Sequence, residues 1–252
     1  MISIRTIISV NYTVEEFGYF TFSFTIANAV MLLLDSFNTI LFPKTIDLMS
    51  SDDNKKKADA LEKMRVGYIL TSHMLVYLAM ICFPILVWFI PKYMPALSSM
   101  NMIALAVLMN TNSYGYSNML IAQNKEHKAG FISAVSLIVN IILGLGLAKI
   151  LNVEYSYITI AILVAYMISS FLMAYEGDTI LRREKSVSYT LKHFFPIRMF
   201  IPYMIALIIS CTQIEYLIFI PLLVFIMLNY KDLQFLKNIA LKLIKEPEVI
   251  DV

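Results

Sequence analysis

The chain has 252 residues, of which 59% are hydrophobic and only 15% are charged, and its formal net charge is +2. Its mean hydropathy is +0.73, whereas soluble globular domains carry about a quarter charged residues. A soluble core cannot bury so much apolar surface, so the composition excludes a soluble globular protein. It predicts an all-α protein, a polytopic bundle of membrane helices in contact with the lipid bilayer and with no nucleic-acid partner.

The apolar residues gather into segments of the length that a membrane requires. One crossing needs about 20 apolar residues, because the hydrocarbon core is about 30 Å thick and a helix rises 1.5 Å per residue. We predict about seven transmembrane helices, at residues 17–42, 67–90, 97–123, 130–151, 155–175, 195–212 and 214–230. The last two are short and nearly adjacent, which predicts a tight helical hairpin.

Lys and Arg residues fall almost entirely on one side of the membrane if each segment crosses it once. Of the 20 basic residues, only Arg5, Lys92 and Lys149 fall on the other side. Because basic loops stay in the cytoplasm, this pattern predicts the orientation of a multi-pass membrane protein. Its amino terminus would lie outside and its carboxy terminus in the cytoplasm.

Residues 1–13 lack the basic region, apolar region and small-residue cleavage site of a signal peptide. We therefore expect this segment to be the outer end of a truncated preceding helix. The alternative is that the first span inserts with its amino end outward unaided, which the charge difference across it also favours.

The first predicted span carries polar residues at helical spacings of three and seven, which places them near one face. The candidates for a substrate cavity on this face are Asn28, Asp35 and Asn38. Asp35 is the only acidic residue deep in a predicted span, so it could carry a proton, bind a cation or contact a polar substrate. The alternative is a carboxylate that bonds to a neighbouring helix and serves packing alone.

The third predicted span carries a second set of polar residues, with i, i+4, i+7 and i+8 spacing. Its cavity candidates are Asn110, Tyr114 and Asn118, and Ser117 completes the pattern. Such amides and hydroxyls could bond to sugar hydroxyls or line an aqueous path. The alternative is bonding between helices, which contributes about 0.6 kcal/mol per bond in membranes.

Residue patterns for covalent chemistry are absent from the sequence. Cys82 and Cys211 lie inside predicted spans, which argues against a disulfide or zinc site. His73 could shuttle protons, but a lone histidine is more often a packing residue. We therefore expect no catalytic residue, no cofactor and no metal site, and the chain is not expected to be an enzyme.

Two runs of sequence resemble the second lobe of Wzx-type polysaccharide (O-antigen) flippases. The run at residues 15–44 is EEFGYFTFSFTIANAVMLLLDSFNTILFPK, in which a glycine and aromatic residues lead into a long helix that ends at a proline before a charged loop. The run at residues 89–148, which begins FIPKYMPALSSMNMIALAVLMNTNSYGYSNML, resembles two later helices of the same lobe. The resemblance covers residues 4–175.

This family belongs to the multidrug, oligosaccharidyl-lipid and polysaccharide exporter superfamily, whose members have two lobes of six helices and often two more helices. The resemblance implies that residues 14–175 form a carboxy-terminal lobe with five transmembrane helices. A basic cytoplasmic loop at 176–198, the hairpin at 199–230 and a cytoplasmic tail at 231–252 would follow. It implies that the first lobe is missing.

The function that the resemblance implies is translocation of a polyprenyl-diphosphate-linked oligosaccharide across the bacterial cytoplasmic (inner) membrane. This step would serve surface polysaccharide, lipopolysaccharide or O-antigen biosynthesis. The implied partners are this lipid-linked oligosaccharide, the amino-terminal lobe and other polysaccharide-assembly proteins. One alternative is a proton- or sodium-coupled multidrug-type exporter of the same superfamily, favoured only through Asp35. Others are a membrane-embedded polysaccharide-processing enzyme, which would usually need a larger outer loop or clustered catalytic residues, and a structural subunit.

Overall fold

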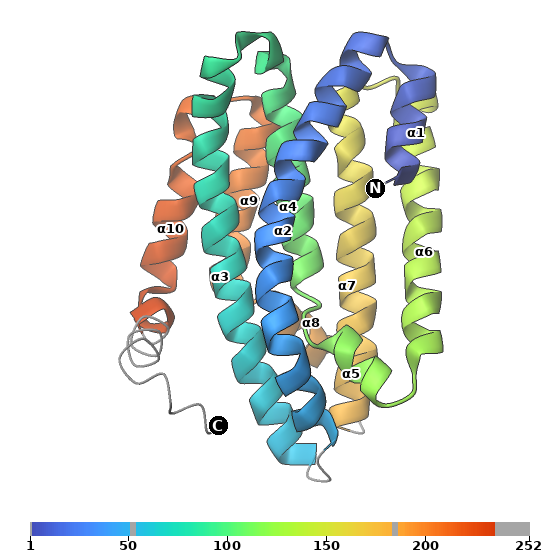
Figure 1. The fold of residues 1–252 in the computed structure, drawn as a ribbon, viewed down its shortest axis with the longest axis vertical. Helices are drawn as coiled ribbons and strands as arrows, with labels where there is room; N and C mark the ends of the chain where they lie inside the picture. Colours follow the sequence, from blue (N-terminus) through green and yellow to red (C-terminus); the bar gives the residue numbers. More distant parts are fainter. Residues whose placement is uncertain (1, 51–53, 183–185, 235–252) are drawn as a thin grey trace.

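The computed structural model describes residues 2–50, 54–182 and 186–234, and every regular element in these ranges is a helix (Figure 1). The α-helices are α1 (Ile2–Asn11), α2 (Val14–Ser50), α3 (Asn54–Phe89), α4 (Leu97–Thr111), α5 (Tyr116–Ala122), α6 (Glu126–Leu145), α7 (Thr159–Arg182), α8 (Val187–Phe194), α9 (Ile197–Thr212) and α10 (Ile220–Leu228). Short 3-10 helices occupy Pro91–Ala96, Tyr155–Ile158 and Glu215–Leu217, and a π-helical turn occupies Gly146–Ile150. The all-α prediction is confirmed.

Several of these helices have the length and apolar composition of membrane spans. Within the described chain, four segments pass this test: Met64–Phe89, Pro91–Thr111, Glu126–Ile150 and Tyr155–Ile180. Together α8 and α9 form a fifth candidate, although they meet at an angle of 64°. The chain is therefore a multi-pass helical membrane protein by length and hydropathy. The number of about seven spans stays a prediction, since the segments 17–42 and 214–230 are not among these candidates.

The long helices stand side by side, and the chain turns alternately at the two ends of the bundle (Figure 1). The turns after α1, α3 and α6 lie at the upper end of the view, whereas the lower end holds α5, α8 and the last turns of α2 and α7. Lys125 and Lys128 belong to this lower end, which we call the basic end, and Lys92 and Lys149 belong to the opposite end. Which side of the membrane each end faces stays a prediction.

The centre of the bundle is α4, which packs against α7, α3, α2 and α9. All of its residues except Ser98 and Asn110 are buried. Small residues such as Ala104 and Ala106 let neighbouring helices approach closely, which matters in lipid because packing rather than the hydrophobic effect holds membrane helices together. In contrast, α6 exposes Phe131 and other large apolar side chains, so one of its faces is free to contact lipid.

The amino-terminal segment is itself a helix and packs closely against α6. Ile4 is fully buried and Ile7 nearly so. Gly144 of α6 makes this contact possible, because a Cβ atom at that position would lie 2.7 Å from Cδ1 of Ile4 and 2.9 Å from Cδ1 of Ile7. The lack of a side chain at Gly144 thus sets the distance between α1 and α6.

The prediction of one continuous span at 97–123 is wrong. α4 ends at Thr111 and a new helix, α5, begins at Tyr116. Between them Gly115 has a φ of 81°, a left-handed backbone conformation that interrupts a right-handed helix. The polar residues of this segment therefore lie on two short helices and a turn.

The carboxy-terminal part is more helical than the sequence indicated. The described part of 176–198 is mostly helix, because α7 continues to Arg182 and α8 follows. α9 and α10 pack together in the region of the expected hairpin. Of the expected tail, residues 235–252 lie outside the described residues.

Replacing the glycine between α1 and α6 tests this packing. Gly144→Val should destabilise the protein by about 1–3 kcal/mol, because the added branched side chain overpacks the contact with Ile4 and Ile7. Gly130→Val on the same helix is the control, since a Cβ atom there meets nothing within 4 Å. The thermal unfolding midpoint in detergent should fall further for Gly144→Val, and equal shifts would contradict the packing.

Reporter fusions test the predicted orientation of the bundle. Alkaline phosphatase folds only outside the cytoplasm, so a fusion after Tyr93 should be active and a fusion after Lys125 inactive if the basic end is cytoplasmic. Phosphatase activity normalised to the amount of fusion protein is the measurement. The opposite pattern would reverse the orientation.

Candidate functional site

The predicted cavity residues fall on helices that are neighbours in the bundle. Asn28 is half-buried on α2, and α2 packs against both α4 and α5. Asn110 is half-buried in the last turn of α4, and Asn118 is buried in α5. Asp35 and Asn38 also belong to α2, but their side chains lie outside the described part of the structure.

Tyr114 lies in the turn between α4 and α5 rather than on a helix. It is buried, and its ring stacks on the ring of Tyr68 of α3 with 3.9 Å between centroids. The expectation that Asn110, Tyr114 and Asn118 share one helical face is therefore wrong, because the helix is broken between them. The cluster of Asn, Ser and Gly residues in the sequence NTNSYGYSN could have revealed the break, since these residues favour turns.

Residues 111–116, which we call the helix break, lie almost wholly inside the protein, and only Ser113 is partly exposed. Non-helical backbone within a membrane protein is tolerated only where protein or water supplies its hydrogen bonds. Here the backbone bonds are of the short 3-10 kind, such as the bond from the amide of Tyr114 to the carbonyl of Thr111 at 3.0 Å. The carbonyl of Asn112 accepts a further bond from Nη2 of Arg65 at 3.1 Å.

Arg65 is the centre of a chain of hydrogen bonds that we call the Arg65–Asp178 network. Its Nη1 donates to Oη of Tyr116 at 3.0 Å, and its guanidinium carbon lies 4.3 Å from the centroid of the same ring. Oη of Tyr116 in turn donates to Oδ1 of Asp178 at 2.8 Å. Oγ1 of Thr190 donates to Oδ2 of Asp178 at 2.9 Å. These bonds join α3, α5, α7 and α8 at the basic end.

The two charged members of the network are both buried, with 6% of Arg65 and 7% of Asp178 exposed. An isolated buried charge is strongly unfavourable, so each depends on the hydrogen bonds that it makes. Arg65 lies near the first residue of one candidate span and Asp178 near the last residue of another. The network therefore lies where the basic end of the bundle meets the edge of the apolar layer.

Tyr116 connects the two charges without carrying one. Burial is the main cause that raises the pKa of its hydroxyl above the usual value, and the nearby Asp178 carboxylate raises it too, while Arg65 opposes them. The hydroxyl therefore stays protonated, accepts from the guanidinium and donates to the carboxylate. Its ring is held closely, since a Cβ atom on Gly177 of α7 would lie 2.2 Å from Cδ1 of Tyr116.

Two buried donors near the break have no hydrogen-bond partner in the described part of the chain. They are Nε of Arg65 and Nδ2 of Asn112. Unpaired buried donors are uncommon in native proteins. This region can therefore accept further hydrogen-bond acceptors, such as phosphate or sugar oxygens, if the helices around it separate.

Arg65 and Asp178 are not among the predicted site residues, because both fall just outside the predicted spans. Arg65 precedes the predicted span at 67–90, and Asp178 follows the one at 155–175. Both were therefore assigned to solvated segments. The available signal was their closeness to the span ends, where one further helical turn carries a residue into the bundle.

His73 has aromatic surroundings. It is fully buried, its ring stacks on Phe225 with 5.5 Å between centroids, and its Nδ1 lies 3.1 Å from Oη of Tyr77. These contacts are typical of a packing role. No group of three or more His, Cys, Asp or Glu side chains is placed to hold a metal ion within the part of the chain that the structure describes.

Comparison of the chain with models of protein families, with curated proteins and with solved structures finds no match. The fold and the candidate spans define a class, the multi-pass helical membrane proteins.

A double-mutant cycle tests whether the network acts as a unit. Tyr116→Phe should destabilise the protein by about 1–3 kcal/mol, because it removes both hydroxyl bonds and leaves two buried charges short of a partner. In an Asp178→Ala background the same change should have a different effect, with a coupling energy of at least about 0.5 kcal/mol.

The measurement is the free energy of unfolding in detergent for the four proteins of the cycle. Tyr175→Phe on α7 is the control, because its hydroxyl makes no hydrogen bond to the residues that the structure describes. Additive effects of Tyr116→Phe and Asp178→Ala would contradict a coupled network.

Proposed function

We propose that the chain is the carboxy-terminal lobe of a flippase that moves a polyprenyl-diphosphate-linked oligosaccharide across the cytoplasmic membrane for surface polysaccharide assembly. The observation that carries this proposal is the helix break at residues 111–116, which begins where the candidate span Pro91–Thr111 ends and has buried polar surroundings. In transporters, discontinuous membrane helices mark substrate sites, because the freed backbone groups and nearby side chains bind polar ligands.

The break favours a transporter over a purely structural subunit. A structural helix bundle is most stable when every backbone group bonds within its own helix. Here α4 stops inside the protein, and a buried arginine satisfies one of the released carbonyls. In this proposal the helix break is kept because it serves a function that an unbroken helix could not serve.

The amides near the break suit a substrate rich in oxygen atoms. Asn110 and Asn118 lie just before and just after the break, and Asn28 lies on α2, which packs against both of their helices. Amides both donate to and accept from sugar hydroxyls. Arg65 bonds to a neutral tyrosine and a carbonyl, so it can exchange these partners for phosphate oxygens, which guanidinium groups bind well. In this proposal Arg65 meets the diphosphate and the amides meet the saccharide.

Transport would proceed without covalent chemistry. The lobe would rock against an amino-terminal lobe and expose a shared cavity to each side in turn. Opening at the basic end requires that the Arg65–Asp178 network separate, since it joins four helices there. The network is then the contact that keeps the cavity closed on that side.

Deletion of the gene from the source organism tests the proposal. The expected result is loss of surface polysaccharide together with accumulation of the lipid-linked oligosaccharide in the membrane. Surface glycan is measured by gel analysis, and the lipid-linked intermediate by extraction and mass spectrometry. The intact gene should restore both, Arg65→Gln should not, and Lys125→Gln at the same end of the bundle is the control.

Other outcomes distinguish the alternatives. Normal glycan with a lost resistance to cationic dyes would indicate a multidrug-type exporter, and its coupling ion could then be tested through Asp35→Asn. Surface glycan that is present but altered in length or acylation would indicate a polysaccharide-processing enzyme. Either result would overturn the flippase proposal.

A further inference from the structure

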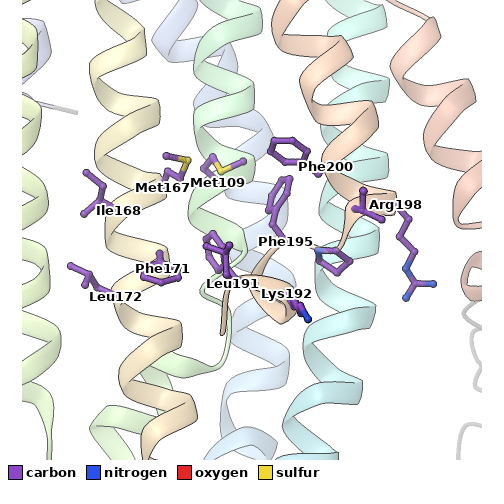
Figure 2. A pocket seen from close by; sticks show the side chains of 13 residues that line it. Met109, Met167, Ile168, Phe171, Leu172, Leu191, Lys192, Phe195, Arg198 and Phe200 are labelled. Atoms are coloured by element: carbon purple, nitrogen blue, oxygen red, sulfur yellow. The ribbon is translucent and has the colours of Figure 1, made fainter. Parts of the chain in front are cut away.

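An apolar pocket of about 920 Å³ lies between α7, α8 and α9 (Figure 2). Met109 of α4, Met167 and Phe171 of α7, and Phe195 and Phe200 near the start of α9 line it. Its volume falls in the range of about 300–1,000 Å³ that is usual for small-molecule sites. Methionine and phenylalanine side chains are adaptable and apolar, so the walls suit hydrocarbon chains.

The pocket exists because α8 and α9 do not form one straight helix. Pro196 cannot continue a helix, and it forces Phe195 into an extended conformation, with φ of −140° and ψ of 83°. The two helices meet at 64°, so α8 lies across the basic end while α9 enters the bundle. A wedge of space opens between this bend and α7.

The helix α8 has the two-sided character of a membrane-surface helix. Thr190 and Phe194 are buried against the bundle, whereas Val187 and Leu191 are 58% and 60% exposed. Lys192 and His193 follow in its last turn. A short helix with exposed apolar and basic residues typically lies at the boundary between headgroups and acyl chains.

The charged residues of the pocket lie on one side of it. Lys192 and Arg198 line the rim, and Figure 2 shows both side chains extending away from the methionine and aromatic side chains. Arg198 forms an ion pair with Asp232. Lys192 makes no ion pair with any residue that the structure describes. Among the described residues of the rim, Lys192 therefore adds one positive charge that no described carboxylate pairs with.

We propose that this pocket binds an anionic glycerophospholipid from the leaflet that surrounds the basic end. The acyl chains would fill the apolar wedge beside Met167 and Phe171, and the phosphate would lie against Lys192 and Arg198. The charge complementarity of the rim carries the assignment, because each basic residue near a membrane surface adds measurably to the binding of anionic lipid. The site does not depend on the proposed transport activity.

The same charges argue against a second copy of the chain as the occupant. A symmetric contact between two copies places the same surface patch on both sides. Lys192 of one copy would then approach the basic rim of the other, and like charges repel across an interface. The negative charge of a lipid phosphate neutralises the basic rim, whereas a second copy of the chain would bring further positive charge to it.

Native mass spectrometry of the full chain in detergent, with added phosphatidylglycerol or phosphatidylcholine, tests the proposal. Phosphatidylglycerol should bind more tightly than phosphatidylcholine. Lys192→Gln should weaken phosphatidylglycerol binding about five-fold, as expected for one basic residue at a membrane surface. The control is Lys149→Gln, which removes an exposed lysine at the opposite end and should change nothing.

A second pair of variants tests the apolar part of the site. Met167→Trp should fill the wedge and reduce the bound fraction of both lipids, whereas Ile138→Trp, at an exposed position on α6, should not. Equal binding of the two lipids, or equal effects of Lys192→Gln and Lys149→Gln, would overturn the proposal. So would a lipid-free dimer that Met167→Trp dissociates, or displacement of phosphatidylglycerol by an equal concentration of a polyprenyl diphosphate.

Discussion

Backbone groups inside a membrane protein must find hydrogen-bond partners within the protein. At the helix break, short 3-10 bonds supply most of these partners, and Arg65 supplies one for the carbonyl of Asn112. Its guanidinium group bonds to the carbonyl of Asn112 and to the hydroxyl of Tyr116 on the far side of the break. Because α5 turns away from the line of α4, Tyr116 can reach Asp178 on α7. The bonds that join α3, α5 and α7 at the basic end thus depend on the interruption of one helix.

The Arg65–Asp178 network also helps to position one wall of the pocket between α7, α8 and α9. Thr190 of α8 donates to Asp178, so the carboxylate that completes the network also fixes α8 against α7. The position of α8, together with the bend at Pro196, defines the wedge beside α7. The pocket and the Arg65–Asp178 network therefore share one short helix, α8.

The all-helical class followed from composition, and the lengths of the apolar segments predicted the helices that qualify as membrane spans. The length of apolar segments does not show where a helix breaks, so the interruption at Gly115 was missed although the turn-forming residues around it were visible. Arg65 and Asp178 were missed for a related reason. Hydropathy assigns a charged residue at a span end to water, whereas here tertiary bonds to Tyr116 draw both into the protein.

The close approach of the Tyr116 ring to Gly177 links the permitted sizes of two residues that are far apart in the sequence. With tyrosine at position 116, even a methyl group at position 177 would collide with the ring. A related protein that carries a larger residue at position 177 must therefore carry a residue smaller than tyrosine at position 116. It would then lose the phenol that bridges Arg65 and Asp178. Paired variation at positions 116 and 177 would separate relatives that keep the tyrosine bridge between Arg65 and Asp178 from relatives that join these helices in another way.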